Sequence, residues 1–590
     1  MFFRLKKSKQ NQYLQIVENS RQGTQVKQRV LCTLGRLDDL QQSGKIESLL
    51  ASGARFAEYA LLLTAHKSGH APAVSTKRIG PTLIFERLWK ETGCQKVLTE
   101  LLKSRAFEFD VERAIFLTVL HRLLGSGGFG QRSDRACMAW KQDYFIPGLD
   151  GANNEKPIEL HHLYRAMAWL GETLPDCQQT VSSKLVPRCV KDLIEESLHE
   201  RRSDLFTEID MVFFDTTSLY FEGEGGLTLG EHGYSKDHRP DLHQLVVGAV
   251  LDGEGRPICC EIWPGNTSDV TTLISIVDRL RMRFRIRHAC VVADRGMISA
   301  EVRKELEETG RPFILGARMR CQKEVRDTVL SDTGPFEEVA GPRERSTDPA
   351  PLKVKEVWVD NQRYVVCVND EQAEHDRWQR EQIVASLREQ LKAGAKSFVG
   401  NKGYKRYLKA EKGNPFTIDE QKLTDEARFD GVWVLHTNTE LSAAEVACQY
   451  KKLWMVEQWF RNCKSLLETR PIFHHCDETI RGHVFCSFLA LVLKRELESR
   501  LDVKLQQKVK KTPKAPTDES KKKSKKDGKE EPRLEWADMI RDLERVQYVE
   551  VNQEGKKFLL RSELQGTAGK IFQSVGVAVP PTVQLGGMPT

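Results

Sequence analysis

The sequence predicts a mixed α/β protein with a mostly helical N-terminal region, and two patterns carry this prediction. From about residue 208, apolar runs and helical patterns follow one another as strand, hairpin, helix, strand, helix and strand. Such an order predicts a mixed sheet covered by helices. From about residue 45 to 200, apolar residues instead recur at helical spacing, as in Glu112–Leu124 and residues 161–174. We therefore expect a helical region that precedes a mixed-sheet core.

The length and composition are those of a globular protein with several domains. A chain of 590 residues exceeds what one hydrophobic core supports, and roughly three to four domains are expected. The net charge of +7 is compatible with a polyanionic partner. The 14 cysteines show no paired spacing, which argues against a disulfide framework or a zinc ribbon. The N-terminus lacks a signal-peptide core and no 18-residue apolar run occurs, so we expect a cytoplasmic protein.

The first strands are expected near the N-terminus. Residues 13–34 predict two strands around a polar turn that contains Gly23. Lys27 and Arg29 alternate with apolar residues there, so one face of this small hairpin region would be basic. That face is either solvated or in contact with phosphate groups.

The mixed sheet is expected between residues 208 and 317. After the apolar run 211–214 come a polar, glycine-rich segment and two strands joined by Asp-Gly-Glu-Gly, a hairpin signal. The remaining elements are a helix (271–285), a strand (289–293), a helix (300–309) and a strand (312–317).

The second half of the chain contains an interruption and a low-complexity segment. Residues 318–428 combine short strand patterns with a charged helix at 371–393, and residues 430–438 then return to the pattern of a buried strand. We interpret 318–428 as an inserted subdomain. A long helix is expected from about residue 442. Residues 504–532 are rich in lysine and lack aromatic residues, which predicts a disordered loop.

Two aspartates end apolar strands in the same way. Asp215 follows the run 211–214 and Asp294 follows 289–293, although a buried carboxylate is costly to desolvate. One interpretation is a turn, because Asp followed by Thr-Thr can bond its own backbone. The other is a metal ion, since carboxylates at one sheet edge repel unless a cation lies between them. Hard oxygen ligands suit Mg²⁺.

A third carboxylate lies in the expected helix 450–468. At 100° per residue, one face of this helix carries Tyr450, Trp454, Glu457, Arg461 and Lys464. Leu453 falls on a separate apolar flank. The face is either an ordinary solvated surface or a functional one, with Glu457 as a metal ligand and its neighbours as groups for stacking and phosphate contact.

Three carboxylates that hold two Mg²⁺ ions suit an in-line attack on a phosphodiester. One ion activates a water or a 3′-hydroxyl, and the other stabilises the leaving oxygen. Asp215, Asp294 and Glu457 are therefore the candidate catalytic and metal-binding residues, with Mn²⁺ as a substitute for Mg²⁺.

These motifs resemble the DDE transposases of bacterial insertion sequences, in the large branch with an insertion before the glutamate. The branch signature is Tyr-x2-Arg-x3-Glu-x6-Lys, and Tyr450, Glu457 and Lys464 match it in spacing. Leu453 stands at the arginine position, where Lys452 or Arg461 would have to substitute. The segments around Asp215 and Asp294, together with residues 263–269 and 470–475, also resemble family segments.

The resemblance implies an RNase H-like catalytic core and a DNA-joining activity. Cleavage of DNA at the ends of an insertion sequence and strand transfer into target DNA are expected, through a DNA hairpin intermediate. The partners would be terminal inverted repeats, target DNA and a second copy of the chain in a paired-end complex, at the bacterial nucleoid. The implied organisation is a β-hairpin region (1–40), a helical DNA-binding region (41–205), the catalytic core (206–317 and 429–500), a β-rich insertion (318–428), a disordered loop (503–533) and a C-terminal segment (534–590).

Other functions and other residues remain open. A transposase-derived DNA-binding protein that no longer cuts and a metal-dependent nuclease that never joins are the alternatives. His474, His475, Cys476 and His483 fit no familiar zinc spacing. Asp252 and Asp269 are expected in turns. Trp263 is expected in the core, with stacking on a flipped base as the other interpretation.

Overall fold

The structure is a computed structural model with two compact units. One unit comprises Met1–Ser75, Val549–Leu560 and Val583–Gly587, and the other comprises Thr76–Tyr548, Arg561–Thr582 and Met588–Thr590. The structure describes residues 2–8, 11–22, 25–46, 49, 73–125, 133–149, 157–179, 186–202, 209–286, 288–341, 350–393, 407–411, 414–511, 535–553 and 556–585.

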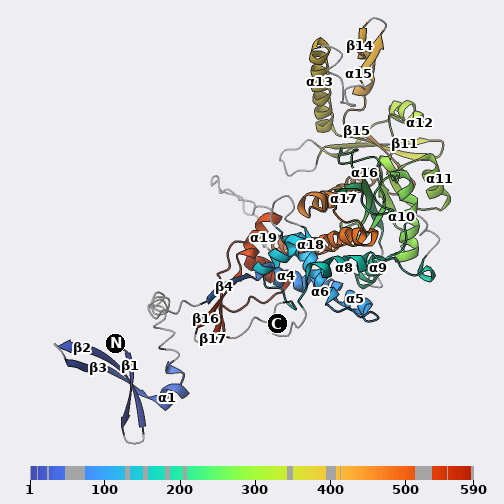
Figure 1. The fold of residues 1–590 in the computed structure, drawn as a ribbon. Helices are drawn as coiled ribbons and strands as arrows, with labels where there is room; N and C mark the ends of the chain where they lie inside the picture. The colour runs from blue at the N-terminus through green and yellow to red at the C-terminus, as the bar shows by residue number, and fades with distance from the viewer. Residues whose placement is uncertain are drawn as a thin grey trace, which may run out of the picture. The chain divides into compact units, whose positions relative to one another are not determined.

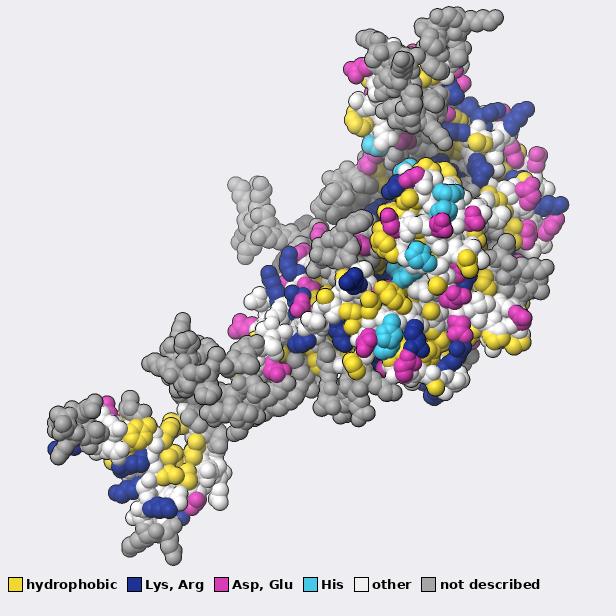
Figure 2. Space-filling model, viewed as in Figure 1, with side chains coloured by type: hydrophobic (Ala, Val, Ile, Leu, Met, Phe, Trp, Pro, Cys, Tyr) yellow, Lys and Arg dark blue, Asp and Glu magenta, His cyan; other side chains and the backbone are white. Residues whose placement is uncertain are grey.

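The N-terminal residues form a three-stranded antiparallel sheet instead of a hairpin. Its strands are β1 (Phe2–Ser8), β2 (Asn11–Gln22) and β3 (Gln25–Arg36), in the order β1-β2-β3, and helix α1 (Leu37–Gln42) follows. The strand β1 was not expected; it pairs Phe3 with Ile16 and Leu5 with Leu14. Several hydrophobic side chains of this sheet are exposed beside Lys and Arg side chains (Figure 2), among them Phe2, Phe3, Leu5, Val30 and Leu31.

The second unit is built on a nine-stranded mixed sheet. Its order is β10-β11-β12-β15-β9-β8-β5-β6-β7. β5 and β8, and β8 and β9, run parallel, whereas the neighbouring pairs are antiparallel. The strands are β5 (Met211–Tyr220), β6 (Gln244–Asp252), β7 (Pro257–Pro264), β8 (Cys290–Ala293), β9 (Phe313–Gly316), β10 (Glu337–Ala340), β11 (Leu352–Val359), β12 (Gln362–Val368) and β15 (Val432–Thr437).

The segment predicted as an insertion contributes strands to this same sheet. β12 pairs with β15, with Val365 opposite Leu435, so residues from 318–428 extend the core sheet. The other elements of the segment are α12 (Lys323–Asp327), α13 (Asp370–Ala393), β13 (Leu408–Glu411), β14 (Asn414–Ile418) and α15 (Glu420–Ala427) (Figure 1). The predicted β-rich insertion thus extends the core sheet by backbone pairing, and its definition as a subdomain stays a prediction.

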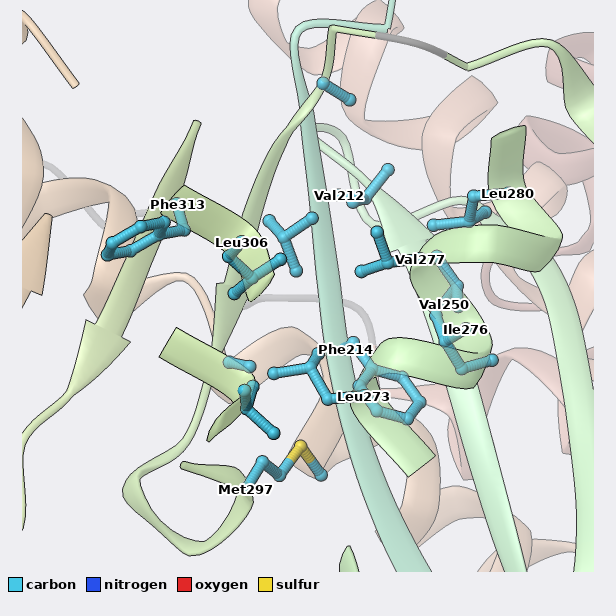
Figure 3. Packing of buried hydrophobic residues seen from close by; sticks show 14 of the residues in the cluster. Val212, Phe214, Val250, Leu273, Ile276, Val277, Leu280, Met297, Leu306 and Phe313 are labelled. Carbon is cyan, nitrogen blue, oxygen red and sulfur yellow. The ribbon is translucent and has the colours of Figure 1, made fainter. Parts of the chain in front are cut away.

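Helices cover both faces of the sheet. Helices α10 (Asp269–Phe284) and α11 (Ala300–Glu308) pack on one face through an apolar core. Figure 3 shows this core, in which Phe214 of β5 meets Leu273 and Ile276 of α10. Helices that follow β15 contact the other face. The predicted mixed α/β architecture is confirmed.

The region before β5 is mostly helical, as predicted. Its helices are α4 (Gly80–Glu91), α5 (Cys94–Leu102), α6 (Val111–Leu124), α7 (Asp134–Trp140), α8 (Leu160–Leu170) and α9 (Val190–Arg202). The long helix α18 (Asp477–Lys511) packs against α4, α6 and α8. Every residue of α6 is buried, since α6 lies between these neighbours.

Helix α18 extends into the predicted lysine-rich loop, because its helical backbone continues to Lys511. Residues 512–534 lie outside the described part of the chain. The chain then forms α19 (Trp536–Glu544), β16 (Gln547–Gln553), β17 (Lys556–Arg561), α20 (Ala568–Val575) and β18 (Val583–Leu585). The strands β18, β17 and β16 form a four-stranded sheet with β4 (Ala73–Arg78) in the order β18-β17-β16-β4. In the described ranges, none of the helices combines the length and apolarity needed to cross a membrane.

Candidate active site

Asp215 and Asp294 lie at neighbouring positions of two parallel strands. β5 and β8 pair in register, with Phe214 opposite Ala293, and each of these residues is followed by one of the aspartates. Residues that follow an in-register pair on neighbouring parallel strands are themselves neighbours, so the two aspartates lie close together. Asp294 follows the end of β8 as predicted, but Asp215 lies within β5, which continues to Tyr220. The interpretation of Asp215 as part of a turn is wrong, because Asp215 is paired with Ala249 within β5, although its carboxylate does accept a hydrogen bond of 2.7 Å from Thr216 N–H.

The carboxylate of Asp215 is poorly compensated. Burial raises its pKa to about 6, and the negative charges of Asp294 and Asp269 act in the same direction. The cation that opposes them is Lys236, whose Nζ lies 4.0 Å from Asp215 Oδ1. A buried carboxylate with negative neighbours is stabilised by an added cation.

Asp294 is held by the tyrosine of the signature. Tyr450 donates its hydroxyl hydrogen to Asp294 Oδ1 at 3.0 Å. Burial raises the pKa of Tyr450, and the charge of Asp294 and this hydrogen bond add to the effect, so the phenol keeps its proton. Tyr450 thus has a partner within the protein, and its predicted contact with DNA stays a prediction.

The helix that carries Glu457 is not continuous, contrary to the prediction. Helix α16 (Ala443–Lys451) ends in a tight turn, α17 (Trp454–Arg461) follows, and a π-helical turn covers Asn462–Leu466. In the tight turn, Leu453 N–H bonds Tyr450 O instead of the carbonyl four residues back. Such turns change the rotation per residue, so a helical-wheel projection at 100° per residue does not give correct side-chain directions across them.

The residues predicted to share one face therefore separate into three places. Trp454, Glu457 and Arg461 are exposed on α17. Tyr450 reaches Asp294, and Lys464 donates to Asp237 Oδ1 at 2.8 Å. Leu453 is buried, as its apolar flank predicts.

Glu457 lies on α17, which packs on the strand of Asp215, but the carboxylate of Glu457 does not reach those of the two aspartates. Helix α17 packs on β5 and β6 through its buried face, which includes Val456 and Phe460, while Glu457 is exposed. Across the part of the chain that the structure describes, the acidic, histidine and cysteine groups whose ligand atoms all lie within 4.8 Å are Asp192, Glu195 and Glu261, not the predicted trio. The structure thus brings Asp215 and Asp294 together and places Glu457 on the adjacent helix.

The cluster of Asp192, Glu195 and Glu261 is a buried ionic clamp between α9, β7 and α10. Arg283 contacts Glu195 and Glu261, each at 2.6 Å. Lys191 lies 2.7 Å from Asp192, and Arg279 lies 2.9 Å from Glu261. Each of the three carboxylates thus has a cationic partner already in contact, which a metal ion would have to displace.

Structure adds three residues that the sequence interpretation missed. Asp269, expected in a turn, is the first residue of α10 and accepts a hydrogen bond of 2.6 Å from Thr216 Oγ1. Lys236 Nζ lies 3.2 Å from Asp269 Oδ2, and Asp237 binds Lys464. The available signal was the run Ser-Lys-Asp-His-Arg at 235–239, which is dense in charge for a connection between two strands.

The remaining candidates have structural roles. Asp252 accepts hydrogen bonds from the backbone of Glu254 and Arg256, as expected for a turn. Trp263 is 1% exposed and belongs to the core. His483 contacts Arg122 Nη2 at 2.9 Å and Thr469 O at 3.0 Å through its two ring nitrogens. Burial lowers the pKa of His483, so its ring is neutral.

Two family models match the chain at the places where these features lie. The model of the IS1634 family transposase N-terminal domain matches residues 3–61, and the model of the transposase DDE domain matches residues 207–493. The chain belongs to the DDE transposases of insertion sequences. The resemblance stated from the motifs is thereby confirmed, and the sheet around β5 and β8 is the RNase H-like core of the transposase. A search of curated proteins gave no match.

The donor set of the transposase fits a divalent metal ion. DDE domains generally use such ions. Asp215 and Asp294 supply carboxylate oxygens, which are the preferred ligands of Mg²⁺. Burial raises the pKa of Asp215 to about 6, and the charges of Asp294 and Asp269 add to this effect, so a bound cation would stabilise the carboxylate. The ionic clamp fits a metal poorly, because its acids are already paired.

Proposed function

We propose that this transposase cleaves DNA at the ends of an insertion sequence and joins those ends to target DNA. The observation that carries the proposal is the placement of Asp215 and Asp294 directly after the paired residues Phe214 of β5 and Ala293 of β8, within a DDE domain. The exposed Glu457 on the helix packed against β5 supplies the third carboxylate.

Asp215, Asp294 and Glu457 would hold two Mg²⁺ ions, for which Mn²⁺ can substitute. When bound, the ions would supply charge stabilisation and an activated oxygen nucleophile for phosphodiester attack. The chain's own contribution is positional: Tyr450 holds the carboxylate of Asp294, and Thr216 N–H holds that of Asp215.

The DNA partners are the terminal inverted repeats and the target. Trp454 and Arg461 flank Glu457 on the exposed face of α17, where a ring and a guanidinium suit stacking and phosphate contact. Tyr450 and Lys464 have protein partners, so we place their DNA contacts second to those of Trp454 and Arg461. A homodimer that pairs two ends, acting at the bacterial nucleoid in the cytoplasm, completes the proposal.

The test is cleavage and joining of the DNA that flanks the gene. A plasmid that carries both flanks is incubated with the full chain and Mg²⁺, and nicked, broken and joined products are separated. Joined products support the proposal. Cleavage without joining, even when pre-nicked ends are supplied with target DNA, would favour a nuclease. Binding of the flanks without cleavage would favour a silent DNA-binding protein.

A further inference from the structure

Two adjacent residues of one turn place opposite charges in two different parts of the site. Lys236 and Asp237 follow each other between β5 and β6. The ammonium of Lys236 lies among carboxylates, whereas the carboxylate of Asp237 lies among cations. Each side chain thus neutralises a cluster of the opposite sign.

The ammonium of Lys236 lies between Thr216 and the carboxylates of Asp269 and Asp215. Its Nζ donates to Thr216 O and to Thr216 Oγ1, each at 2.8 Å, and lies 3.2 Å from Asp269 Oδ2. An ammonium has three hydrogens, and these partners use them. Asp215 Oδ1 is 4.0 Å from the same nitrogen. A cation therefore already occupies the space beside Asp215.

Asp237 is bound at the cations in the same manner. Lys464 Nζ lies 2.8 Å from one carboxylate oxygen and Arg470 Nη1 lies 3.0 Å from the other. The Asp237 side chain is 6% exposed and that of Lys464 is 12% exposed. An anion with two oxygens between a lysine and an arginine has the charge and geometry of a phosphate group.

We propose that Lys236 and Asp237 are positioning residues that occupy the cation and phosphate places of the DNA-free site. Lys236 stands where the charge of a divalent cation is needed, and Asp237 stands where a DNA phosphate would contact Lys464 and Arg470. Because the two residues share one turn, displacement of either loosens the other, so metal binding and DNA binding favour each other. This inference rests on the proposed function.

The inference predicts tighter binding when either side chain is neutralised. Lys236→Met should tighten Mn²⁺ binding about tenfold, the order expected when a unit charge near an acidic, partly hydrated site is removed. Asp237→Asn should tighten binding of a short duplex without insertion-sequence ends about tenfold at low salt, and should steepen the salt dependence by about one phosphate. Calorimetry with Mn²⁺ and fluorescence anisotropy with the duplex measure these effects without catalysis.

The neighbouring Arg239 and Asp241 provide matched controls. They form an exposed ion pair in the same connection, with Nη2 and Oδ2 2.8 Å apart. Arg239→Met and Asp241→Asn make the same charge changes and should leave both affinities within about twofold. Lys236→Arg and Asp237→Glu keep the charges and should behave like the original chain.

Hydrogen exchange in the unaltered chain gives an independent test, should a variant fail to fold. The backbone N–H of Lys236 donates to Ser218 Oγ at 2.9 Å, so displacement of the turn should speed exchange in residues 234–240. Saturating Mn²⁺ or duplex DNA should produce this change. Unchanged exchange, or weaker Mn²⁺ binding by Lys236→Met, would overturn the inference.

The same measurements separate this inference from the proposed function. If Mn²⁺ binds and Asp215→Asn removes that binding, the metal site stands whatever Lys236→Met does. If Asp215→Asn binds Mn²⁺ as well as the original chain does, the metal assignment itself fails.

Discussion

The molecule contains two clusters of carboxylates, which differ in how far Lys and Arg side chains neutralise them. In the ionic clamp, the carboxylates of Asp192, Glu195 and Glu261 are at most 1% exposed, and Lys191, Arg279 and Arg283 contact them. In the candidate active site, Lys236 lies near Asp215 and Asp269, and the charge of Asp294 adds to that of Asp269 in raising the pKa of Asp215. Asp215 and Asp269 are about one quarter exposed.

The difference shows that proximity of carboxylates does not identify a metal site. The tighter cluster is the clamp, where Arg283 and Lys191 outweigh the effect of burial and lower the pKa of Asp192. Burial raises the pKa of Glu195 to about 7 against the same cations. What marks the candidate active site is accessibility: Asp215 and Asp269 are partly exposed, whereas the acids of the clamp are closed off from solvent by their cationic partners.

The largest effect expected from this comparison is the loss of catalysis. Asp215→Asn, Asp294→Asn and Glu457→Gln should each lower DNA cleavage by on the order of 10³-fold, because each removes a charge from the proposed metal site. The midpoint temperature of thermal unfolding should stay unchanged or rise, since a poorly compensated charge is removed. Asp278→Asn, an exposed acid on α10, is the control. Cleavage retained in any of the three variants removes that residue from the site.

Removing a cation from the clamp should affect stability instead. Arg283→Met leaves buried carboxylates unpaired, and we expect a loss of about 3–5 kcal/mol in the free energy of unfolding. The Mn²⁺ affinity of the folded protein should not change. Chemical denaturation with calorimetry of the folded state tests both statements, with the exposed Arg281→Met as control. A large change in Mn²⁺ affinity would mean that the two clusters are not independent.

The pH dependence of metal binding sharpens the comparison further. Burial raises the pKa of Asp215 to about 6, so its carboxyl group holds a proton below that pH and a cation must displace it. Mn²⁺ affinity should therefore be flat above pH 6 and fall by about tenfold for each unit below it. Calorimetric titrations between pH 5 and 8 measure this, and an affinity independent of pH would exclude Asp215 as the controlling ligand.

The smallest effect concerns the hydroxyl that orients Asp294. Tyr450→Phe removes the hydrogen bond of 3.0 Å to Asp294 Oδ1 but keeps the ring, and should slow cleavage by roughly three- to tenfold. Tyr234→Phe removes a hydroxyl from a side chain that is 85% exposed and should have no effect. A loss as large as that of Asp294→Asn would instead make Tyr450 a catalytic residue.

The sequence predicted the site to the extent that its residues lie in regular elements. The apolar runs before Asp215 and Asp294 predicted paired strands, and β5 and β8 are paired. The helical wheel over 450–468 placed Leu453 apart from the polar face, and the structure agrees, since Leu453 is buried. Tyr450 and Lys464 bond Asp294 and Asp237, which the helical wheel could not predict, since the tight turn before α17 and the π-helical turn after it change the angular step.

The sequence by itself determined the family, the mixed α/β class, the helical N-terminal region and the two aspartates that follow apolar runs, because these depend on local periodicity and on motif spacing. Tertiary structure alone decided that residues of 318–428 complete the core sheet. It also decided that the turn at Lys236 and Asp237 lies against both charged groups of the site. The physical reason is that strand pairing and charge compensation join residues far apart in the chain, and local pattern carries no record of such partners.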